Sequence, residues 1–419
     1  MTICLKRLFF IGAFITLGGC SVFHANTDLM SPPQLSVAKE EIRQAISLYL
    51  PENVELQMPL NHQDGSPIEL VDLNGDEEDE AVVFYKSQGQ ADIVKGIVLQ
   101  NNNGWEKIAD IRGEGKILVD LTFDDLTDDG HKEILAGFAY TEDSKDYGLI
   151  VYDIFSSSKP SILLNKPYSH FLVDAFEQVE KNNLVIIKFV KEHKNTVSLY
   201  DYRNEAIVEV DQLELDHYIN GYYNVMSGQI TEKQKGLMLD VGLGAHSAQT
   251  FIISISDDEM TNWFSFDNDP TFKASAVLSA DTNGDGILEY GILEEPYMEE
   301  PLPYATTPFI TVYYQLHDDG SSHVVSKAYY DYEHLYKVSI PLDWPRLQID
   351  RSDDRKRIEI KPAGTDVVFL DVYVSEDKRP RGDGWFVLAE TEEFVYLSKT
   401  TKKENRRLFQ LLQPLDMAN

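Results

Sequence analysis

The chain has 419 residues, of which 43% are hydrophobic, so it is long enough to bury a sizeable core and to form two domains. It carries 70 acidic and 37 basic side chains, and the net charge of −33 repels nucleic acids and attracts cations. Aromatic residues make up 11% of the chain, which favours strands over helices. The composition therefore excludes a typical nucleic-acid-binding protein and predicts a mainly β fold.

The first twenty residues have the pattern of an export signal. A positively charged start precedes an apolar run, Leu8–Leu17, which is too short to predict a membrane-spanning helix. The sequence Leu17-Gly18-Gly19-Cys20 follows and resembles the bacterial lipobox. We expect residues 1–19 to be removed as a lipoprotein signal peptide and Cys20 to carry the lipid. An ordinary cleaved signal peptide is the alternative.

The lipid anchor would place the protein on the extracytoplasmic face of a bacterial cell membrane. The chain has only two cysteines, Cys4 and Cys20, so no disulfide can join parts of the folded body. Residues 20–35 are polar and contain proline, as in a tether. From Ser36 to Leu50 the pattern becomes helical, with Ile42 and Ile46 on one face, and Pro51 ends it.

Three acidic loops organise most of the remaining chain. Each has oxygen-bearing side chains at its first, third, fifth and ninth positions and leads into an apolar strand. The loops span Asp72–Glu80, Asp125–Glu133 and Asp281–Glu289. This spacing can wrap a loop around a hard cation such as Ca²⁺, which takes six to eight oxygens at about 2.3–2.6 Å. A solvated acidic turn without metal is the alternative, because Asp, Asn and Gly favour turns.

The three loops differ in quality. The third loop matches fully and has Gly286 at its sixth position, where a tight turn is needed. The second loop has Thr127, a weaker neutral ligand, at its third position. The first loop has Glu77 where glycine is expected, so we expect its turn to be less favourable.

The loops belong to a repeat of about 50 residues. The first two begin 53 residues apart, and two degenerate copies, starting at Asp174 and Gly228, lie between the second and third loops. A further strand follows each copy at a steady offset. These strands are expected to begin at Ile97, Leu149, Val197, Phe251 and Phe309. A period near 50 with several short strands indicates a propeller blade.

The pattern resembles the FG-GAP or VCBS-type repeat of integrin-like and bacterial surface β-propellers. Its marks here are D-x-[NT]-x-D-x-x-x-E before a strand and then a glycine-bearing turn, such as Ala136-Gly137 or Gly242–Ala245. The resemblance covers roughly residues 60–335. It implies a β-propeller with about five visible repeats, and we expect this propeller and the N-terminal helix to fill residues 36–335.

The resemblance also implies one to three structural calcium ions, each held between two strands of a blade. At the seventh loop position a backbone carbonyl is the expected ligand. The complete set of expected metal ligands is Asp281, Asn283, Asp285, Ile287 and Glu289; Asp72, Asn74, Asp76, Glu78 and Glu80; and Asp125, Thr127, Asp129, His131 and Glu133. The Asp174 and Gly228 copies lack these carboxylates, so we expect them to bind no metal.

The repeat is lost after Leu335. Residues 336–419 contain several short apolar runs and a basic segment, 400–412, with a helical pattern. We predict a small α+β domain over 336–419, with a sixth blade as the alternative.

No catalytic constellation is recognisable in the sequence. His246-Ser247 lacks a surrounding nucleophile motif, and the ten histidines include no zinc-binding pattern. The sequence therefore favours a non-enzymatic module, lipid-anchored and calcium-binding, that binds a protein or a glycan. The alternatives are an enzyme acting on cell-wall glycan and a structural or assembly factor of the cell envelope.

Overall fold

The computed structural model describes most of the chain. The described residues are 37–61, 66–87, 93–141, 143–144, 147–156, 159–176, 181–264, 269–378 and 383–413. The chain divides into two compact units, Met1–Pro51 and Glu52–Asn419. The predicted signal peptide over 1–19, the tether over 20–35 and the lipidation site at Cys20 lie outside the described residues.

The described part of the first unit is one helix, α1 (Val37–Tyr49). Its length agrees with the prediction over 36–50, and Ile42 and Ile46 are buried as their shared face predicted. Leu50 and Pro51 follow the helix, and proline cannot continue it.

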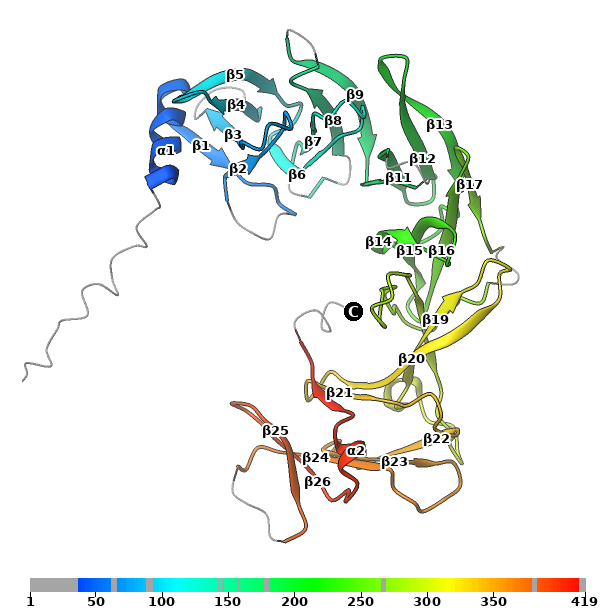
Figure 1. Cartoon of the computed structure of the whole chain (residues 1–419). Coiled ribbons are helices and arrows are strands. Elements are labelled where there is room, and N and C mark those ends of the chain that lie inside the picture. Colours follow the sequence, from blue (N-terminus) through cyan, green and yellow to red (C-terminus); the bar gives the residue numbers. More distant parts are fainter. Residues whose placement is uncertain are drawn as a thin grey trace, which may run out of the picture. The chain divides into compact units, whose positions relative to one another are not determined.

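The second unit is built from antiparallel sheets, which confirms the mainly β prediction (Figure 1). The first sheet contains β1 (Val54–Gln57), β2 (Ile68–Val71), β3 (Glu80–Ser87), β4 (Lys95–Asn101) and β5 (Trp105–Arg112). The second contains β6 (Ile117–Asp124), β7 (Glu133–Ala139), β8 (Tyr147–Asp153) and β9 (Ser161–Tyr168). The third contains β10 (His170–Asp174), β11 (Asn183–Val190), β12 (Lys194–Arg203) and β13 (Ala206–Glu214).

Three further sheets follow in the chain. The fourth contains β14 (Gly221–Gln229), β15 (Lys235–Gly244), β16 (Ser247–Ser256) and β17 (Glu259–Asn262). The fifth contains β18 (Tyr290–Glu294), β19 (Ile310–Leu316), β20 (Ser322–Asp331), β21 (Tyr336–Ser339) and β27 (Phe409–Leu411). The sixth contains β22 (Leu347–Arg351), β23 (Arg357–Pro362), β24 (Leu370–Ser375), β25 (Phe386–Glu390) and β26 (Val395–Ser398).

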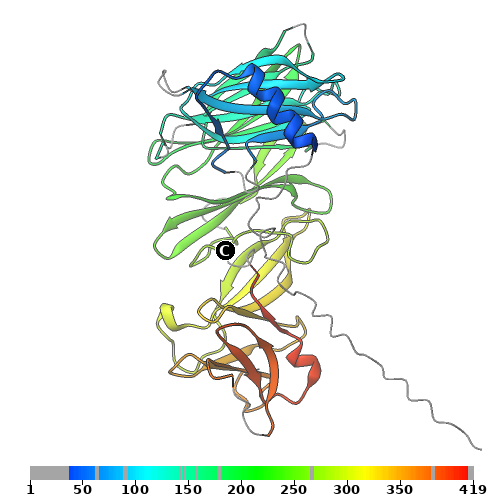
Figure 2. The ribbon, with the colours of Figure 1, turned by 90° about the vertical axis from the view of Figure 1, so that its left-hand side faces the viewer.

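Strand order follows chain order in the second, third and fourth sheets, so each of these sheets is a local antiparallel meander (Figures 1 and 2). In the first sheet β1 and β2 both pair with β3, along successive stretches, and together they occupy the place of one strand. The second and third strands of these sheets are almost fully buried, whereas β6, β10 and β14 are half-exposed along most of their length.

Apolar side chains of consecutive sheets share common cores. Phe84 of the first sheet meets Phe138 of the second edge to face, with ring centroids 6.2 Å apart. Further shared clusters join the second sheet to the third, the third to the fourth and the fourth to the fifth. The strands predicted from the repeats lie within these sheets, at β3 and β4, β7 and β8, β11 and β12, β15 and β16, and β18 and β19.

Two local predictions are wrong. Gly137 lies within β7 rather than in a turn, where its missing Cβ atom leaves room for the hydroxyl of Tyr168. The turn expected over Gly242–Ala245 begins only at Ala245, after the end of β15, and Gly242 lies in the strand beside the hydroxyl of Tyr223. The helix predicted over 400–412 is limited to α2 (Lys403–Arg406). The chain then becomes β27, since Phe409 pairs with Val338 and stacks on Tyr336.

The C-terminal segment is mainly a sheet. The fifth and sixth sheets share one apolar core, and β27 returns from the chain end to extend the fifth sheet. The predicted boundary after Leu335 falls in the turn between β20 and β21. The division into domains at that point stays a prediction.

Candidate metal centres

The three acidic loops occupy equivalent places in their sheets. The first two connect a strand that ends just before the first aspartate to a strand that begins at the ninth-position glutamate, and the third leads into β18 directly after Glu289. Asp72 follows β2 and Glu80 begins β3, while Asp125 follows β6 and Glu133 begins β7. Before the third loop the pairing is reduced to one bridge, between Ala280 and Glu289. All three loops therefore lead into a strand just after or at the ninth-position glutamate, while their common origin as repeats stays a prediction.

Two residues in each loop have left-handed backbone conformations. The sixth-position residues Glu77, Gly130 and Gly286 have φ values of 69°, 86° and 86°. The fourth-position residues Gly75, Asp128 and Gly284 have φ values of 75°, 59° and 79°. The sequence analysis anticipated the sixth position but missed the fourth, where Gly, Asn and Asp are the residues that tolerate this conformation.

Glu77 has a left-handed backbone and Glu78 does not, which predicts opposite effects of glycine at these two neighbouring residues. Glu77→Gly should raise the free energy of unfolding by up to about 1 kcal/mol, because glycine adopts the left-handed conformation without strain. Gly286→Ala should lower it by about 1–2 kcal/mol. Urea unfolding in calcium-free buffer measures both. Glu78→Gly is the matched control and should be destabilising, since Glu78 is not left-handed. A stabilisation by Glu78→Gly equal to that by Glu77→Gly would contradict the argument.

The first aspartate of each loop organises the turn. In the third loop Asp281 accepts hydrogen bonds from the N–H groups of Gly284 (2.7 Å) and Gly286 (2.9 Å). Asp72 and Asp125 accept the same pair in the other two loops. The fifth-position aspartate accepts the N–H of the seventh residue, and this bond from Ile287 lowers the pKa of Asp285. The carboxylates are thus held in place before any cation binds.

The ninth-position glutamates are buried at the base of the loops. Glu80, Glu133 and Glu289 are 1%, 1% and 0% exposed. One oxygen of each accepts the N–H of the second loop residue, at 2.7–2.9 Å. Burial raises the pKa of all three, to about 7 for Glu133 and Glu289. A nearby positive charge would therefore favour the ionised form of these buried carboxylates.

The third loop fits a cation best. Carboxylate oxygens of Asp281, Asp285 and Glu289 all lie within 4.8 Å of one another, so this triad could hold a metal ion. Oε1 of Glu289 is buried and has no hydrogen-bond partner. In the first loop the corresponding oxygen of Glu80 accepts from Asn74 (3.1 Å) and Gln100 (3.2 Å). The chemistry of an all-oxygen donor set suits a hard cation.

The remaining expected ligands lie in the same loops. Asn283 and Asn74 bond the fifth-position aspartates of their loops through their side-chain amides. Thr127 donates to Glu133 at 3.4 Å. The expected carbonyl donors Glu78, His131 and Ile287 occupy the seventh positions, and each donates its N–H to the fifth-position aspartate. Their roles as metal ligands stay predictions.

The degenerate copies contain lysine near the equivalent loops. Lys235 donates to the carbonyl of Ala175 at 2.6 Å and lies 3.6 Å from Asp174. Lys233 forms an ion pair with Asp318 at 2.9 Å. These side chains supply positive charge near the connections that begin at Asp174 and Gly228, where the sequence predicts no metal.

The loops also connect neighbouring sheets. The N–H of Lys132, in the second loop, donates to the carbonyl of Leu73, in the first loop, at 2.7 Å. The N–H of Leu288, in the third loop, donates to the carbonyl of Gln229, in the Gly228 copy, at 2.8 Å. In both pairs the eighth loop residue bonds the second residue of the preceding copy. A cation that rigidifies one loop would therefore also fix the contact between two sheets.

The sequence analysis missed a buried ion pair in the fourth sheet. Lys273 lies 2.9 Å from Asp240, and the two side chains are 0% and 1% exposed. Asp240 interrupts the apolar run of β15, which is a signal that the sequence offers. Lys273 lies in a connection without regular strand pattern, so nothing in the sequence identifies it as the partner.

No family model matches the chain, and no curated protein matches it. Among the described residues no helix is long and apolar enough to cross a bilayer.

Three solved structures match the chain at low similarity. A protein from Lactobacillus plantarum is 9% identical over 74% of this chain and 80% of its own, with a TM-score of 0.29. The exotype rhamnogalacturonan lyase YesX is 13% identical over 74% and 76%, with a TM-score of 0.26. The rhamnogalacturonan lyase of Bacillus licheniformis is 10% identical over 83% and 72%, with a TM-score of 0.31. TM-scores of this size carry no inference about function.

Proposed function

We propose that this chain is a lipid-anchored, calcium-binding β-propeller of the FG-GAP or VCBS type, which acts outside the cell membrane as a protein- or glycan-binding module. The observation that carries the calcium assignment is the Asp281–Glu289 loop. It combines three carboxylates within reach of one ion with a buried oxygen of Glu289 that has no partner.

The sheet arrangement supports a propeller. Antiparallel meanders of four strands, repeated about every 50 residues and packed one against the next, are the building pattern of propeller blades. The half-exposed first strands β6, β10 and β14 suit the inner positions of blades, and the acidic loops suit the corners between first and second strands. Calcium would then be structural, since it would hold a strand connection and a sheet-to-sheet contact.

Calcium titration with thermal melting tests the metal assignment. Millimolar calcium should raise the melting temperature, because a ligand that binds only the folded state stabilises it by mass action. Asp281→Asn and Asp285→Asn should each remove most of this rise. Asp257→Asn is the matched control, since Asp257 is an exposed acid in a turn outside the three loops. No rise with calcium in the unmodified protein would overturn the metal part of the proposal.

The lipid anchor on Cys20 is tested separately. Cys20→Ala should move the protein from the membrane fraction to the soluble fraction of the cell envelope without changing its calcium response. Retention of the variant in membranes would contradict the anchor while leaving the calcium assignment untouched.

Two other functions are the alternatives. An envelope enzyme acting on wall glycan would release fragments from purified wall polymers, and single Asp or Glu substitutions would abolish this release. A structural or assembly factor of the envelope would instead be recovered in a crosslinked complex with other envelope proteins. The binding module is preferred because metal binding would explain the buried ninth-position glutamates of the acidic loops without any catalytic role.

A further inference from the structure

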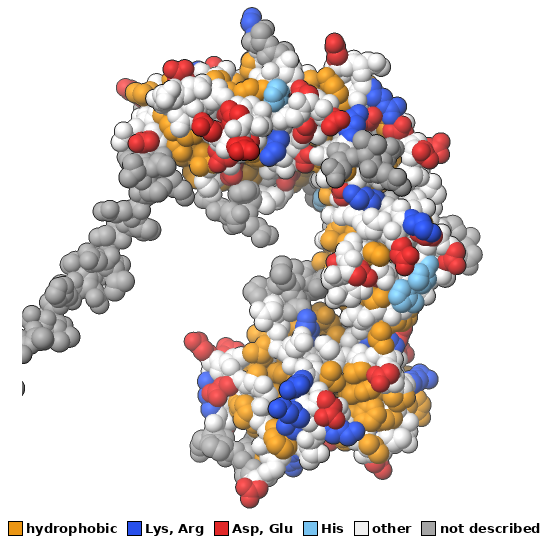
Figure 3. Space-filling view, viewed as in Figure 1, with side chains coloured by type: hydrophobic (Ala, Val, Ile, Leu, Met, Phe, Trp, Pro, Cys, Tyr) orange, Lys and Arg blue, Asp and Glu red, His pale blue; other side chains and the backbone are white. Residues whose placement is uncertain are grey.

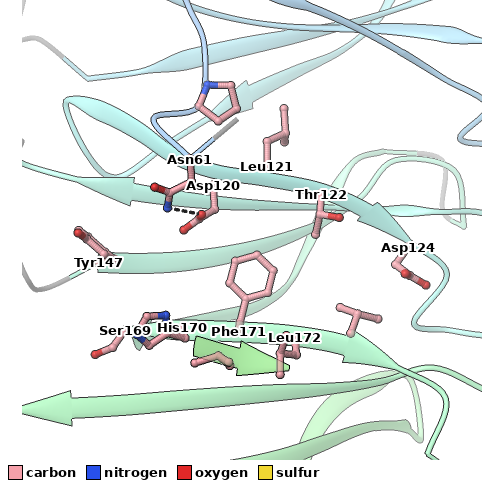
Figure 4. Close-up of a pocket in the computed structure, with 13 residues that line it drawn as sticks. Asn61, Asp120, Leu121, Thr122, Asp124, Tyr147, Ser169, His170, Phe171 and Leu172 are labelled. Atoms are coloured by element: carbon pink, nitrogen blue, oxygen red, sulfur yellow. Dashed lines mark hydrogen bonds between the residues drawn. The ribbon is translucent and has the colours of Figure 1, made fainter. Parts of the chain in front are cut away.

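A cavity of about 580 Å³ opens beside the half-exposed strands β6 and β10 (Figure 4). This volume lies in the range of small-molecule sites. The polar residues that line it are Asn61, Asp120, Thr122, Asp124, Ser169 and His170. Figure 4 shows Asp120, Thr122 and Asp124 following one another along β6, with the ring of Phe171 pointing toward them from β10. None of these residues belongs to the acidic loops.

The carboxylate of Asp120 is held in place from two sides. The side-chain amide of Asn61 donates to one oxygen at 2.7 Å, and the hydroxyl of Tyr168 donates to the other. Asp120 pairs across the sheet with Gly137, and a Cβ at Gly137 would overlap the Tyr168 hydroxyl. Glycine at this strand position therefore creates the space through which the buried tyrosine reaches the carboxylate.

The second carboxylate lies further along the same strand. Residues 120 and 124 are four apart on one face of β6, which separates them by about 13 Å at the usual rise of a strand. The side-chain amide of Asn182 donates to Asp124. This separation exceeds the roughly 5–9.5 Å between the paired carboxyl groups of glycosidases, so the pair suits binding of an extended ligand rather than hydrolysis.

The charge of the cavity is negative. Among the described residues that line it, none is Lys or Arg. Burial lowers the pKa of His170, whose ring packs edge to face against Tyr222, so this side chain adds no positive charge at neutral pH. Acidic side chains are also spread over the visible face of the molecule (Figure 3). The cavity therefore attracts cationic groups and repels carboxylates and phosphates.

The middle of the cavity is apolar. Phe171 and Leu172 lie between the two acidic ends, and Tyr147 borders the Asp120 end. Protonated amines form charge-assisted hydrogen bonds with carboxylates and also lie favourably over aromatic rings. A chain of sugar rings would place apolar ring faces against this middle section and amine and hydroxyl donors at its acidic ends.

The backbone edge of β6 is already occupied where a peptide strand would begin. The N–H groups of Leu60 and Asn61 donate to the carbonyls of Leu118 and Val119, both at 3.1 Å. A peptide that binds by adding a strand would have to displace these bonds. The edge therefore favours a saccharide over an extended peptide.

We propose that this cavity binds an oligosaccharide bearing primary amines, with Asp120 and Asp124 each accepting from an ammonium group and Phe171 supporting the sugar ring between them. This inference rests on the proposed function as a binding module and names the class of its ligand.

Calorimetric titration of the full-length protein in a mild detergent tests this proposal. The probes are glucosamine, N-acetylglucosamine and galacturonate oligomers of equal length, used at mildly acidic pH so that the amines are protonated. The glucosamine oligomer should bind about tenfold or more tightly than the N-acetylated one, because only the former makes charge-assisted bonds. The galacturonate oligomer should not bind, and salt should weaken the glucosamine complex.

Asp120→Asn and Asp124→Asn should each weaken binding of the glucosamine oligomer by about tenfold. Asp110→Asn is the matched control, since it removes an acid on β5 that pairs with Lys107 outside the cavity, and it should leave binding unchanged. Each variant should keep the cooperative thermal unfolding of the unmodified protein, which shows that it folds. Thr122→Val is a further variant that keeps the charge and should weaken binding by a smaller factor.

Three results would overturn the proposal: equal or tighter binding of the N-acetylated or galacturonate oligomer, unchanged binding by both Asp variants, or tighter binding of oligolysine than of the glucosamine oligomer. The last would assign the cavity to a basic peptide. Failure of the calcium test with intact glucosamine binding would remove the metal assignment alone. An intact calcium response without any saccharide binding would remove this inference alone.

Discussion

Lys273→Ala should lower the free energy of unfolding by about 3–5 kcal/mol, because it leaves the carboxylate of Asp240 buried without its counter-charge. The ammonium group of Lys273 donates to Asp240 (2.9 Å), to the hydroxyl of Thr250 (2.9 Å) and to the carbonyl of Val277 (2.5 Å). Asp240 in turn accepts from Ser279 through both its N–H (2.6 Å) and its hydroxyl (3.0 Å). The network therefore ties the connection that contains Lys273 and Ser279 to the fourth sheet.

Urea unfolding at neutral pH measures this effect as a lower midpoint with an unchanged slope. Lys233→Ala is the matched control. Lys233 forms an ion pair of the same 2.9 Å length with Asp318, but its side chain is 78% exposed. Its loss should change stability by less than about 1 kcal/mol, because exposed ion pairs contribute little. Equal effects of the two substitutions would show that burial of the Lys273 pair has no energetic consequence.

The calcium-free protein should lose stability as the pH rises from about 5 to about 8. The pKa values of Glu133 and Glu289 are raised by burial from 4.5 to about 7 in the folded chain. Between these values the folded state holds protons that the unfolded state has released, so raising the pH favours unfolding. The stability present below pH 4.5 is lost as the pH passes through 7, by roughly 3 kcal/mol for each glutamate.

Calcium should remove most of this pH dependence, because it binds the ionised carboxylates and replaces the lost protons as counter-charge. Melting temperatures across this pH range, with a chelator and with millimolar calcium, provide the measurement. Glu289→Gln should reduce the slope in the calcium-free series by about half, since one of the two strongly shifted groups is gone. A melting temperature that stays constant without calcium would show that these glutamates ionise freely in the folded protein.

Local residue patterns were sufficient to predict the repeating elements of this fold. The spacing of acidic residues from Asp281 to Glu289 located the third loop, and the alternation of loops and apolar runs located two strands in each copy. These features depend on interactions within about ten residues, such as the bonds from Gly284 and Gly286 to Asp281. The prediction for 400–412 was wrong because Phe409 pairs with Val338, a distant residue that a local pattern does not contain.

The candidate sites also combine features that follow from local sequence with features that depend on distant residues. The place of Glu289 in the loop predicts a metal ligand. It does not predict that this side chain is completely buried or that its Oε1 has no hydrogen-bond partner. The cavity residues gave no signal, because Asn61, Asp120 and Tyr168 are separated by 59 and 48 residues along the chain. The turn expected at Gly137 is a strand position instead, because the role of this glycine depends on the Tyr168 hydroxyl rather than on its neighbours in sequence.

The sequence by itself determined the mainly β class, the period of the sheets and the three acidic loops, because strand propensity, turn chemistry and ligand spacing are properties of neighbouring residues. Only the tertiary structure decided which loop brings its carboxylates closest together, which charges are buried, and which strands share a cavity. Burial and charge pairing depend on side chains that folding brings together from distant parts of the chain. The Lys273–Asp240 pair and the Asp120–Asp124 cavity therefore exist only once the sheets are packed.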